Sequence, residues 1–229
     1  MDRRMLAATA AVGCAVVSAG CGGTTGGTAV KATAPKLIAR PLVEREISGL
    51  LLSPDQVNAA VGVNNMAVTN TATSMADNAA IMTPQECLAI DGAAETRVYA
   101  GSGFVAERDQ SLSDGDKLEH YVKQAVVLFP TADQARAFFT ASAHQWPACH
   151  EFTHTQSQTH WTVGPIATTE DTVSTTATEE EASAPGRACG RALEHRNNII
   201  IDVNTCAADP GDSASKIADQ IAANVAAKW

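Results

Sequence analysis

The stretch 188-ACGRALEHRNNIIIDVNTC-206 decides how the last third of this chain folds. Two asparagines, Asn197 and Asn198, stand between two runs that suit β-strands, and Asn tolerates the positive φ of a two-residue type I′ turn. With these residues at the tip of a hairpin, the antiparallel register brings Cys189 opposite Cys206. The pattern therefore predicts a hairpin whose open end is closed by a disulfide.

Whether these sulfurs oxidise depends on the compartment, which the N-terminus indicates. Residues 1–20 combine Arg3 and Arg4 with an apolar run and a small-residue ending, as secretory signal peptides do. The run is too short to span a membrane. The stretch that ends at Cys21 resembles the bacterial lipobox, which implies lipidation of Cys21, although the lipobox consensus prefers Leu at the position of Ser18. The alternative is ordinary secretion with a chance cysteine.

The organisation that follows from this start has three parts. Residues 1–20 are the predicted signal peptide, 21–46 a lipidated flexible tether rich in Gly, Thr and Ala, and 47–229 one folded domain. The formal net charge is −9, so there is no electrostatic basis for binding a nucleic-acid backbone. We therefore expect no nucleic-acid partner, and a membrane association that runs through the lipid.

Four cysteines remain after Cys14 and Cys21 are set aside. An even number of cysteines in an exported chain indicates disulfides. Because the hairpin register pairs two of them, Cys87 and Cys149 are left to pair with each other. Metal binding is the competing interpretation, but no C-x-x-C pair supports it.

Three segments have the pattern of helices. The first starts at a Ser53 cap with Pro54 and ends at Gly62. The second, 131–146, starts at a Thr131 cap, and the third follows 209-DPGD-212 with an apolar stripe at every fourth residue. About six strands are expected, in 95–108, 118–130, 151–163, 171–181 and the two arms of the hairpin. This order favours an α+β fold with an antiparallel sheet.

The segment 150-HEFTHTQSQTH-160 contains H-E-x-x-H, the motif in which two histidines bind zinc and a glutamate activates water. The candidate ligands are His150, Glu151, His154 and His160. Pro147 and the Thr-rich composition argue against the helix that this motif needs, and no methionine follows it. As a single strand, the segment would put the histidines on one face, with the first two roughly 13 Å apart, too far to share an ion. The histidines would then be exposed or line a groove, where they can also respond to acid pH. We expect no metal and no other cofactor.

Three stretches together are similar to a known family: 51-LLSPDQVNAAVG-62, 124-QAVVLFPTADQARAFFTASAHQWPAC-149 and 186-GRACGRALEHRNNIIIDVNTC-206. With the closing helix, they resemble the PknH-like extracellular sensor domain of mycobacteria, found on a membrane kinase and in lipoproteins. The resemblance implies a compact α+β domain with two disulfides and a cleft proposed to hold a ligand. It supplies no catalytic residues, and the chain has neither V-A-I-K nor H-R-D of a kinase.

The leading hypothesis is a lipid-anchored sensor or ligand-binding module on the outer face of the mycobacterial cell membrane, without catalytic activity. Its ligand would be a small molecule or a cell-wall component in the cleft. The alternatives are an exported zinc-dependent hydrolase built on the H-E-x-x-H segment, and a structural envelope protein that binds other proteins.

Overall fold

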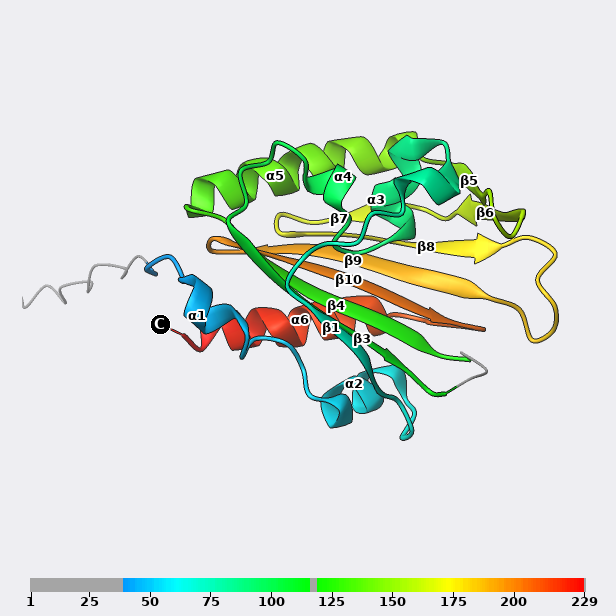
Figure 1. Cartoon of the computed structure of the whole chain (residues 1–229), viewed down its shortest axis with the longest axis horizontal. Coiled ribbons are helices and arrows are strands. Elements are labelled where there is room, and N and C mark those ends of the chain that lie inside the picture. The colour runs from blue at the N-terminus through cyan, green and yellow to red at the C-terminus, as the bar shows by residue number, and fades with distance from the viewer. Residues whose placement is uncertain (1–38, 116–118, 229) are drawn as a thin grey trace, which may run out of the picture. The chain divides into compact units, whose positions relative to one another are not determined.

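A computed structural model describes residues 39–115 and 119–228, and its centre is one antiparallel sheet of ten strands (Figure 1). The strand order is β1-β3-β4-β10-β9-β8-β6-β5-β2, and β7 pairs with β8. The strands are β1 (Ala67–Ala72), β2 (Met82–Thr83), β3 (Ala106–Ser113), β4 (Tyr121–Leu128), β5 (Glu151–His154), β6 (Thr159–Val163), β7 (Ala167–Thr168), β8 (Thr172–Glu179), β9 (Ala188–Arg196) and β10 (Ile199–Ala207).

The hairpin of β9 and β10 occupies the middle of the sheet and has the predicted register. Cys189 lies directly opposite Cys206, and the two are joined by a disulfide. Only one residue of the turn, Asn197, has a positive φ, of 52°. The turn is therefore not type I′, which needs a positive φ at both central residues. The Asn198 side chain is buried and bonds to the backbone of Leu42 and Phe129.

Helices cover both faces of the sheet. On one face α1 (Glu44–Ile47), α2 (Pro54–Val61) and α6 (Ser213–Ala226) share a hydrophobic core with β4 and β10. On the other face α3 (Leu88–Asp91), α4 (Thr96–Tyr99) and α5 (Ala132–Gln145) share a second core with β8 and β9. Figure 1 shows α5 and α6 on opposite sides of the strands. Short 3₁₀ turns lie at Ala79–Ile81, Gln85–Cys87 and Trp146–Ala148.

The helix starts follow the predicted capping chemistry. Ser53 accepts a hydrogen bond from the backbone of Gln56, whose side chain accepts one in return, and Gly62 ends the helix at a φ of 87°. Thr131 caps α5 by accepting from the backbone N–H of Gln134, but the Gln134 side chain accepts from the Thr131 hydroxyl and not from its backbone. The apolar stripe of α6, which includes Ile217, is buried against the sheet.

The prediction of about six strands and three helices was too low, because short elements are formed by tertiary contacts. Ten strands and six α-helices occur among the described residues, and three of the helices are single turns of four residues. The segment 95–108 is not one strand: Thr96–Tyr99 is helical, and β3 starts only at Ala106. The segment 151–163 is a hairpin of β5 and β6 instead of one strand.

The packed part of the chain begins before the predicted boundary at Ile47. Leu42 is buried, and its backbone N–H and C=O both bond to the Asn198 side chain. The last residues of the predicted tether, 42–46, therefore belong to the folded region. The predicted signal peptide 1–20 and Cys21 lie outside the described residues. Within the part that the structure describes, no helix has both the length and the apolar character that crossing a membrane requires.

Candidate functional site

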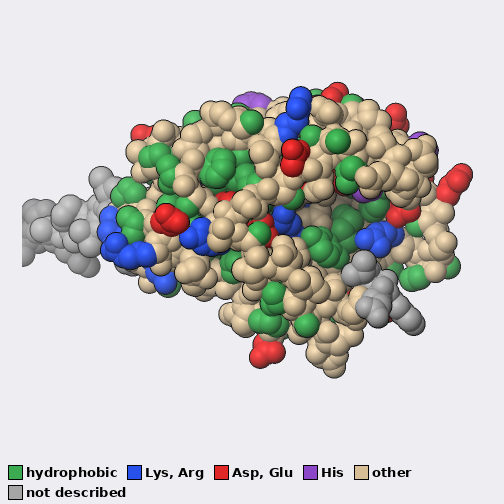
Figure 2. Space-filling model, in the orientation of Figure 1, with side chains coloured by type: hydrophobic (Ala, Val, Ile, Leu, Met, Phe, Trp, Pro, Cys, Tyr) green, Lys and Arg blue, Asp and Glu red, His purple; other side chains and the backbone are tan. Residues whose placement is uncertain are grey.

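A cavity of about 500 Å³ lies beside the Cys189–Cys206 disulfide, on the sheet face that carries α3, α4 and α5. This size falls within the range of sites for small ligands. Its walls come from α3, the β5–β6 hairpin and the ends of β4, β8, β9 and β10. Figure 2 shows a hollow on this face in which hydrophobic side chains gather, with basic and acidic side chains at its edge. The apolar lining consists of Ile90, Phe152, Trp161, Ala177 and the disulfide.

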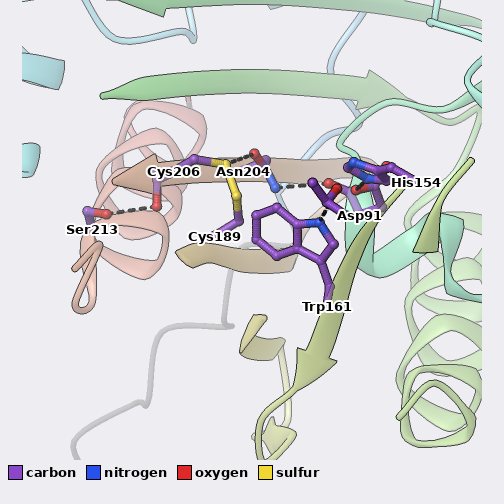
Figure 3. Close-up of a disulfide and its surroundings, with 9 residues drawn as sticks. Asp91, His154, Trp161, Cys189, Asn204, Cys206 and Ser213 are labelled. Atoms are coloured by element: carbon purple, nitrogen blue, oxygen red, sulfur yellow. Dashed lines mark hydrogen bonds and ion pairs between the residues drawn. A yellow bond between two sulfur atoms is a disulfide. The ribbon is translucent and has the colours of Figure 1, made fainter. Parts of the chain in front are cut away.

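The β5–β6 hairpin supplies the aromatic wall. Phe152 and Trp161 are directly opposite each other in its register, so their side chains lie on the same face. Their rings stack with centroids 5.9 Å apart and an interplanar angle of 4°. In Figure 3 the Trp161 indole lies between the disulfide and the Asp91–His154 pair. Only 4% of Trp161 is exposed, so this wall is almost completely packed within the fold.

The segment that carries Asp91 is held against the sheet by two buried charges, Arg191 on β9 and Asp202 on β10. They pair with each other at 2.8 Å. Arg191 donates to the carbonyls of Ala89 and Gly92, and Asp202 accepts from the backbone N–H of Ala94. Because these bonds are buried, apart from the partly buried one to Gly92, breaking one leaves an unpaired polar group, which is expensive. The cavity wall at α3 is therefore firmly fixed.

The Cys87–Cys149 disulfide supports the same wall from the other side. The sequence predicts this disulfide because the hairpin register pairs the other two cysteines, and the structure confirms it. The bridge ties Cys87, in the turn just before α3, to Cys149, which lies two positions before β5. It thus fixes the distance between the two elements that face each other across the cavity.

An ion pair between Asp91 and His154 spans these two elements. The Nε2 atom of His154 lies 2.6 Å from Oδ1 of Asp91. The hydrogen bond to Asp91 raises the pKa of His154 above its ordinary value, and burial opposes this effect. The pair is partly buried at the cavity and stabilises the imidazolium form of the histidine.

Further polar groups complete the lining. Asn204 on β10 donates to the backbone carbonyl of Asp91 and lies beside Cys206 in Figure 3. Glu179 and Arg187 also line the cavity, and no ion pair among the described residues involves either of them. The remaining polar lining residues are Tyr121, Ser157 and Thr159.

The structure separates the residues of the H-E-x-x-H segment. Residues 151–154 form strand β5 and not a helix, so the zinc motif lacks the geometry that it needs. The expectation that the histidines share one face was wrong, because the chain reverses after His154. His154 lies on the cavity side, whereas His160 is on the other face, 2.9 Å from the Thr153 hydroxyl. His150 and Glu151 are exposed. Within residues 39–115 and 119–228, no cluster of three or more His, Cys, Asp or Glu side chains suits a metal ion.

Sequence reasoning missed most of the cavity. His154 was considered as a zinc ligand but not as a partner of Asp91, and Trp161 was not singled out. One signal was present. In the predicted hairpin register, Arg191 and Asp202 lie on the same face as the cysteines, so two charged side chains point into the centre of a sheet. Such residues indicate a buried polar network.

These features define a disulfide-braced α+β domain with a cavity of about 500 Å³ at the open end of its central hairpin. The family model described as "PknH-like extracellular domain" matches residues 42–224, and the chain belongs to this family. The start of the match coincides with the buried Leu42.

Similar proteins come from mycobacteria. The serine/threonine-protein kinase PknH of Mycobacterium bovis is 36% identical over 187 residues, which are 80% of this chain and 31% of the kinase. PknH of Mycobacterium tuberculosis is 36% identical over 191 residues, with 80% and 30% coverage. The chain thus spans about a third of the length of these relatives. The crystal structure of the extracellular domain of PknH from M. tuberculosis matches with a TM-score of 0.77 and 34% identity, covering 82% of this chain and 98% of that one.

Proposed function

We propose that this protein is a lipid-anchored, extracytoplasmic sensor or ligand-binding module of the mycobacterial cell envelope, and that it is not an enzyme. The single observation that carries the proposal is the cavity beside the Cys189–Cys206 disulfide, in a domain of a family described as extracellular. The cavity combines an apolar wall with a few polar groups, which is the usual composition of a small-molecule site.

The arrangement of the polar groups favours binding over catalysis. The Asp91 carboxylate is engaged with His154, so the Nε2 atom of that histidine is already occupied, and the hydrogen bond raises the pKa of the ring. A general base needs a nitrogen that is free to accept a proton near neutral pH. The site therefore offers hydrogen bonds and an apolar surface, with no activated nucleophile among its described residues.

Binding is tested on the full chain produced in a mycobacterial host and isolated from membranes in mild detergent. Native mass spectrometry compares the wild type with Ser157→Trp, which places a bulky ring at the cavity. Gln156→Trp is the matched control, because Gln156 is exposed in the same turn and does not line the cavity. We expect a non-covalent ligand on the wild type and on the control, and its loss in Ser157→Trp. The same mass spectrum from all three proteins, with no added mass, would refute the proposal.

Anchoring is tested separately by membrane fractionation of Cys21→Ala. The lipobox predicts that this variant is released from membranes. A variant that stays firmly attached contradicts the lipid anchor without affecting the proposal of a ligand site.

A further inference from the structure

We infer that the domain rests on the anionic headgroups of the membrane with the end that carries the turn of the central hairpin, and that the cavity faces away from the lipid. This orientation rests on the lipid anchor of the proposed function, but it is independent of what the cavity binds. We call this end the tip surface. It consists of the exposed and half-buried residues within 40–46, 105–108, 131–136, 169–171, 196–198 and 226–228.

The chain enters the domain at the tip surface. The backbone C=O of Arg40 accepts a hydrogen bond from the Asn197 side chain, and the backbone of Leu42 exchanges two with the Asn198 side chain. The predicted tether therefore joins the lipidated cysteine to this end of the domain. The arms of the hairpin have nine residues each, so their open end, where the cavity lies, is about 26 Å further along the strands at about 3.3 Å per residue.

Three further elements reach the tip surface. β3 begins level with the turn, because Ala106 pairs with Leu128, which in turn pairs with Ile199. α5 starts shortly after β4 ends at the same Leu128. α6 begins near the open end, where Ser213 donates a hydrogen bond to Thr205 of β10, and runs back toward the tip. Figure 1 accordingly shows the C-terminus beside α1.

Basic side chains gather at the tip surface of a protein that is acidic as a whole. The chain has a formal net charge of −9, yet basic side chains slightly outnumber acidic ones at this end. Figure 2 shows Lys and Arg side chains together at the end of the domain where α1 lies. Because an anionic membrane repels the acidic remainder of the domain, the tip is the end that it repels least. The basic residues are Arg40, Arg45, Arg108, Arg136, Arg196 and Lys228.

Ion pairs neutralise most of the acidic side chains on this surface. Glu44, Glu46 and Asp171 each pair with an arginine of the tip surface, and Asp133 and Glu170 are the other acidic residues on it.

Two basic side chains remain available for lipid phosphates. Arg45 and Lys228 are exposed, and no ion pair within residues 39–115 and 119–228 involves either of them.

Exposed apolar side chains occur at the tip surface as well. Val43, which is 40% exposed, directly precedes α1, and Val105, which is 58% exposed, directly precedes β3. The third large apolar side chain with this exposure in the described part of the chain is Val68, on the edge strand β1. A surface that combines basic and apolar side chains suits the boundary between lipid headgroups and acyl chains. The entry point of the chain, the charges and the apolar side chains thus all indicate the same end of the domain.

The two exposed lysines of the α6 segment report which end of the domain faces the lipid. Lys228 belongs to the tip surface, and Lys216 lies near the open end. They are about 18 Å apart along the helix axis at about 1.5 Å per residue, which exceeds twice the Debye length of about 8 Å at physiological salt. Contact of the tip with headgroups therefore protects Lys228 and leaves Lys216 accessible.

The experiment is acetylation of the full lipidated chain in nanodiscs, with the rate at each lysine followed by mass spectrometry. One set of discs contains phosphatidylcholine alone, and the other contains equal parts of phosphatidylcholine and phosphatidylglycerol. We expect Lys228 to react roughly threefold or more slowly in the anionic discs than in the neutral ones, and Lys216 to react at the same rate in both. High salt should reduce the difference at Lys228.

Two charge reversals locate the contact. Arg45→Glu alters the tip surface and should remove about half or more of the protection of Lys228. Arg97→Glu is the matched control, because Arg97 is exposed on α4 outside the tip surface, and it should leave the protection unchanged. An unchanged melting curve is the folding check for both variants.

The outcomes separate this orientation from the proposed function. Equal rates at Lys228 in the two kinds of disc overturn the inference, and so does protection of Lys216 in place of Lys228, which turns the cavity toward the membrane. Protection of Lys228 that is the same in Arg45→Glu and Arg97→Glu overturns it as well. All three outcomes leave the lipid anchor standing, because the chain still co-elutes with the discs. A chain that co-elutes with neither kind of disc removes both the anchor and the inference.

Discussion

Replacing Glu107 by Gln is expected to stabilise the protein at pH 8 and to have little effect at pH 4. Glu107 lies on β3 with 1% of its surface exposed, and neither of its carboxyl oxygens has a hydrogen-bond partner among the described residues. Burial raises its pKa to about 7, and the neighbouring Asp109 adds to the effect. Lys123 is the nearby cation, but its ammonium group lies 3.5 Å from Asp109.

The sign and size of the effect follow from proton linkage. Below the ordinary pKa of 4.5, Glu107 is neutral in both the folded and the unfolded state. As the pH rises toward 7, the unfolded state loses this proton while the folded state keeps it, so the free energy of unfolding falls. Each pKa unit is worth about 1.4 kcal/mol, so a rise from 4.5 to about 7 corresponds to a total loss of about 3 kcal/mol. Gln removes the charge and therefore this loss.

The assay is urea unfolding of wild type and Glu107→Gln at pH 4, 5, 6, 7 and 8 with the disulfides intact. The difference in free energy of unfolding should grow from near zero at pH 4 to about 3 kcal/mol at pH 8. The control, Glu170→Gln, alters an exposed carboxylate and should match the wild type throughout. A difference between wild type and Glu107→Gln that does not change with pH would refute the reasoning.

Three further predictions address the hairpin and the cavity. Asn198→Ala removes three buried hydrogen bonds and should lower the free energy of unfolding, measured in urea, by about 2–4 kcal/mol. A loss below about 0.5 kcal/mol, which is typical of a surface substitution, would contradict the role of Asn198 in holding Leu42 against the sheet. The double variant Cys189→Ser/Cys206→Ser should have a free energy of unfolding about 3 kcal/mol lower, which is the loop-entropy value for a bridge of this span. An unchanged midpoint of urea unfolding would contradict a stabilising role for this disulfide. Asp91→Asn should lower the pKa of His154, followed by NMR titration of its ring. The stabilisation by this pair is present below the ordinary histidine pKa and is lost as the pH rises through the raised pKa of His154. The same pKa of His154 in the wild type and in Asp91→Asn would contradict the ion pair.

Local sequence signals predicted the elements that depend on local chemistry. The cap at Ser53 and the stop at Gly62 define a helix through backbone hydrogen bonds of neighbouring residues, and the structure has that helix. The Cys189–Cys206 bridge could be predicted because a two-residue turn fixes the register of every pair in a hairpin. The pairing of Cys87 with Cys149 followed from it by elimination.

The elements that sequence reasoning missed are held by distant partners. Strand β1 is polar and exposed, and it exists because its backbone pairs with β3. The single helical turn Thr96–Tyr99 replaced a predicted strand because Tyr99 is drawn into the core, where its hydroxyl bonds to Asp202. The ion pair of Asp91 with His154 joins residues 63 positions apart, and no local pattern encodes such a contact.

The most direct test of the account is a crystal structure of the protein isolated from a mycobacterial cell envelope, inspected for electron density at the cavity. The account predicts density for a bound molecule that lies against Trp161 and the Cys189–Cys206 disulfide. Density for a bound molecule elsewhere on the domain, with this cavity closed or empty, would contradict it.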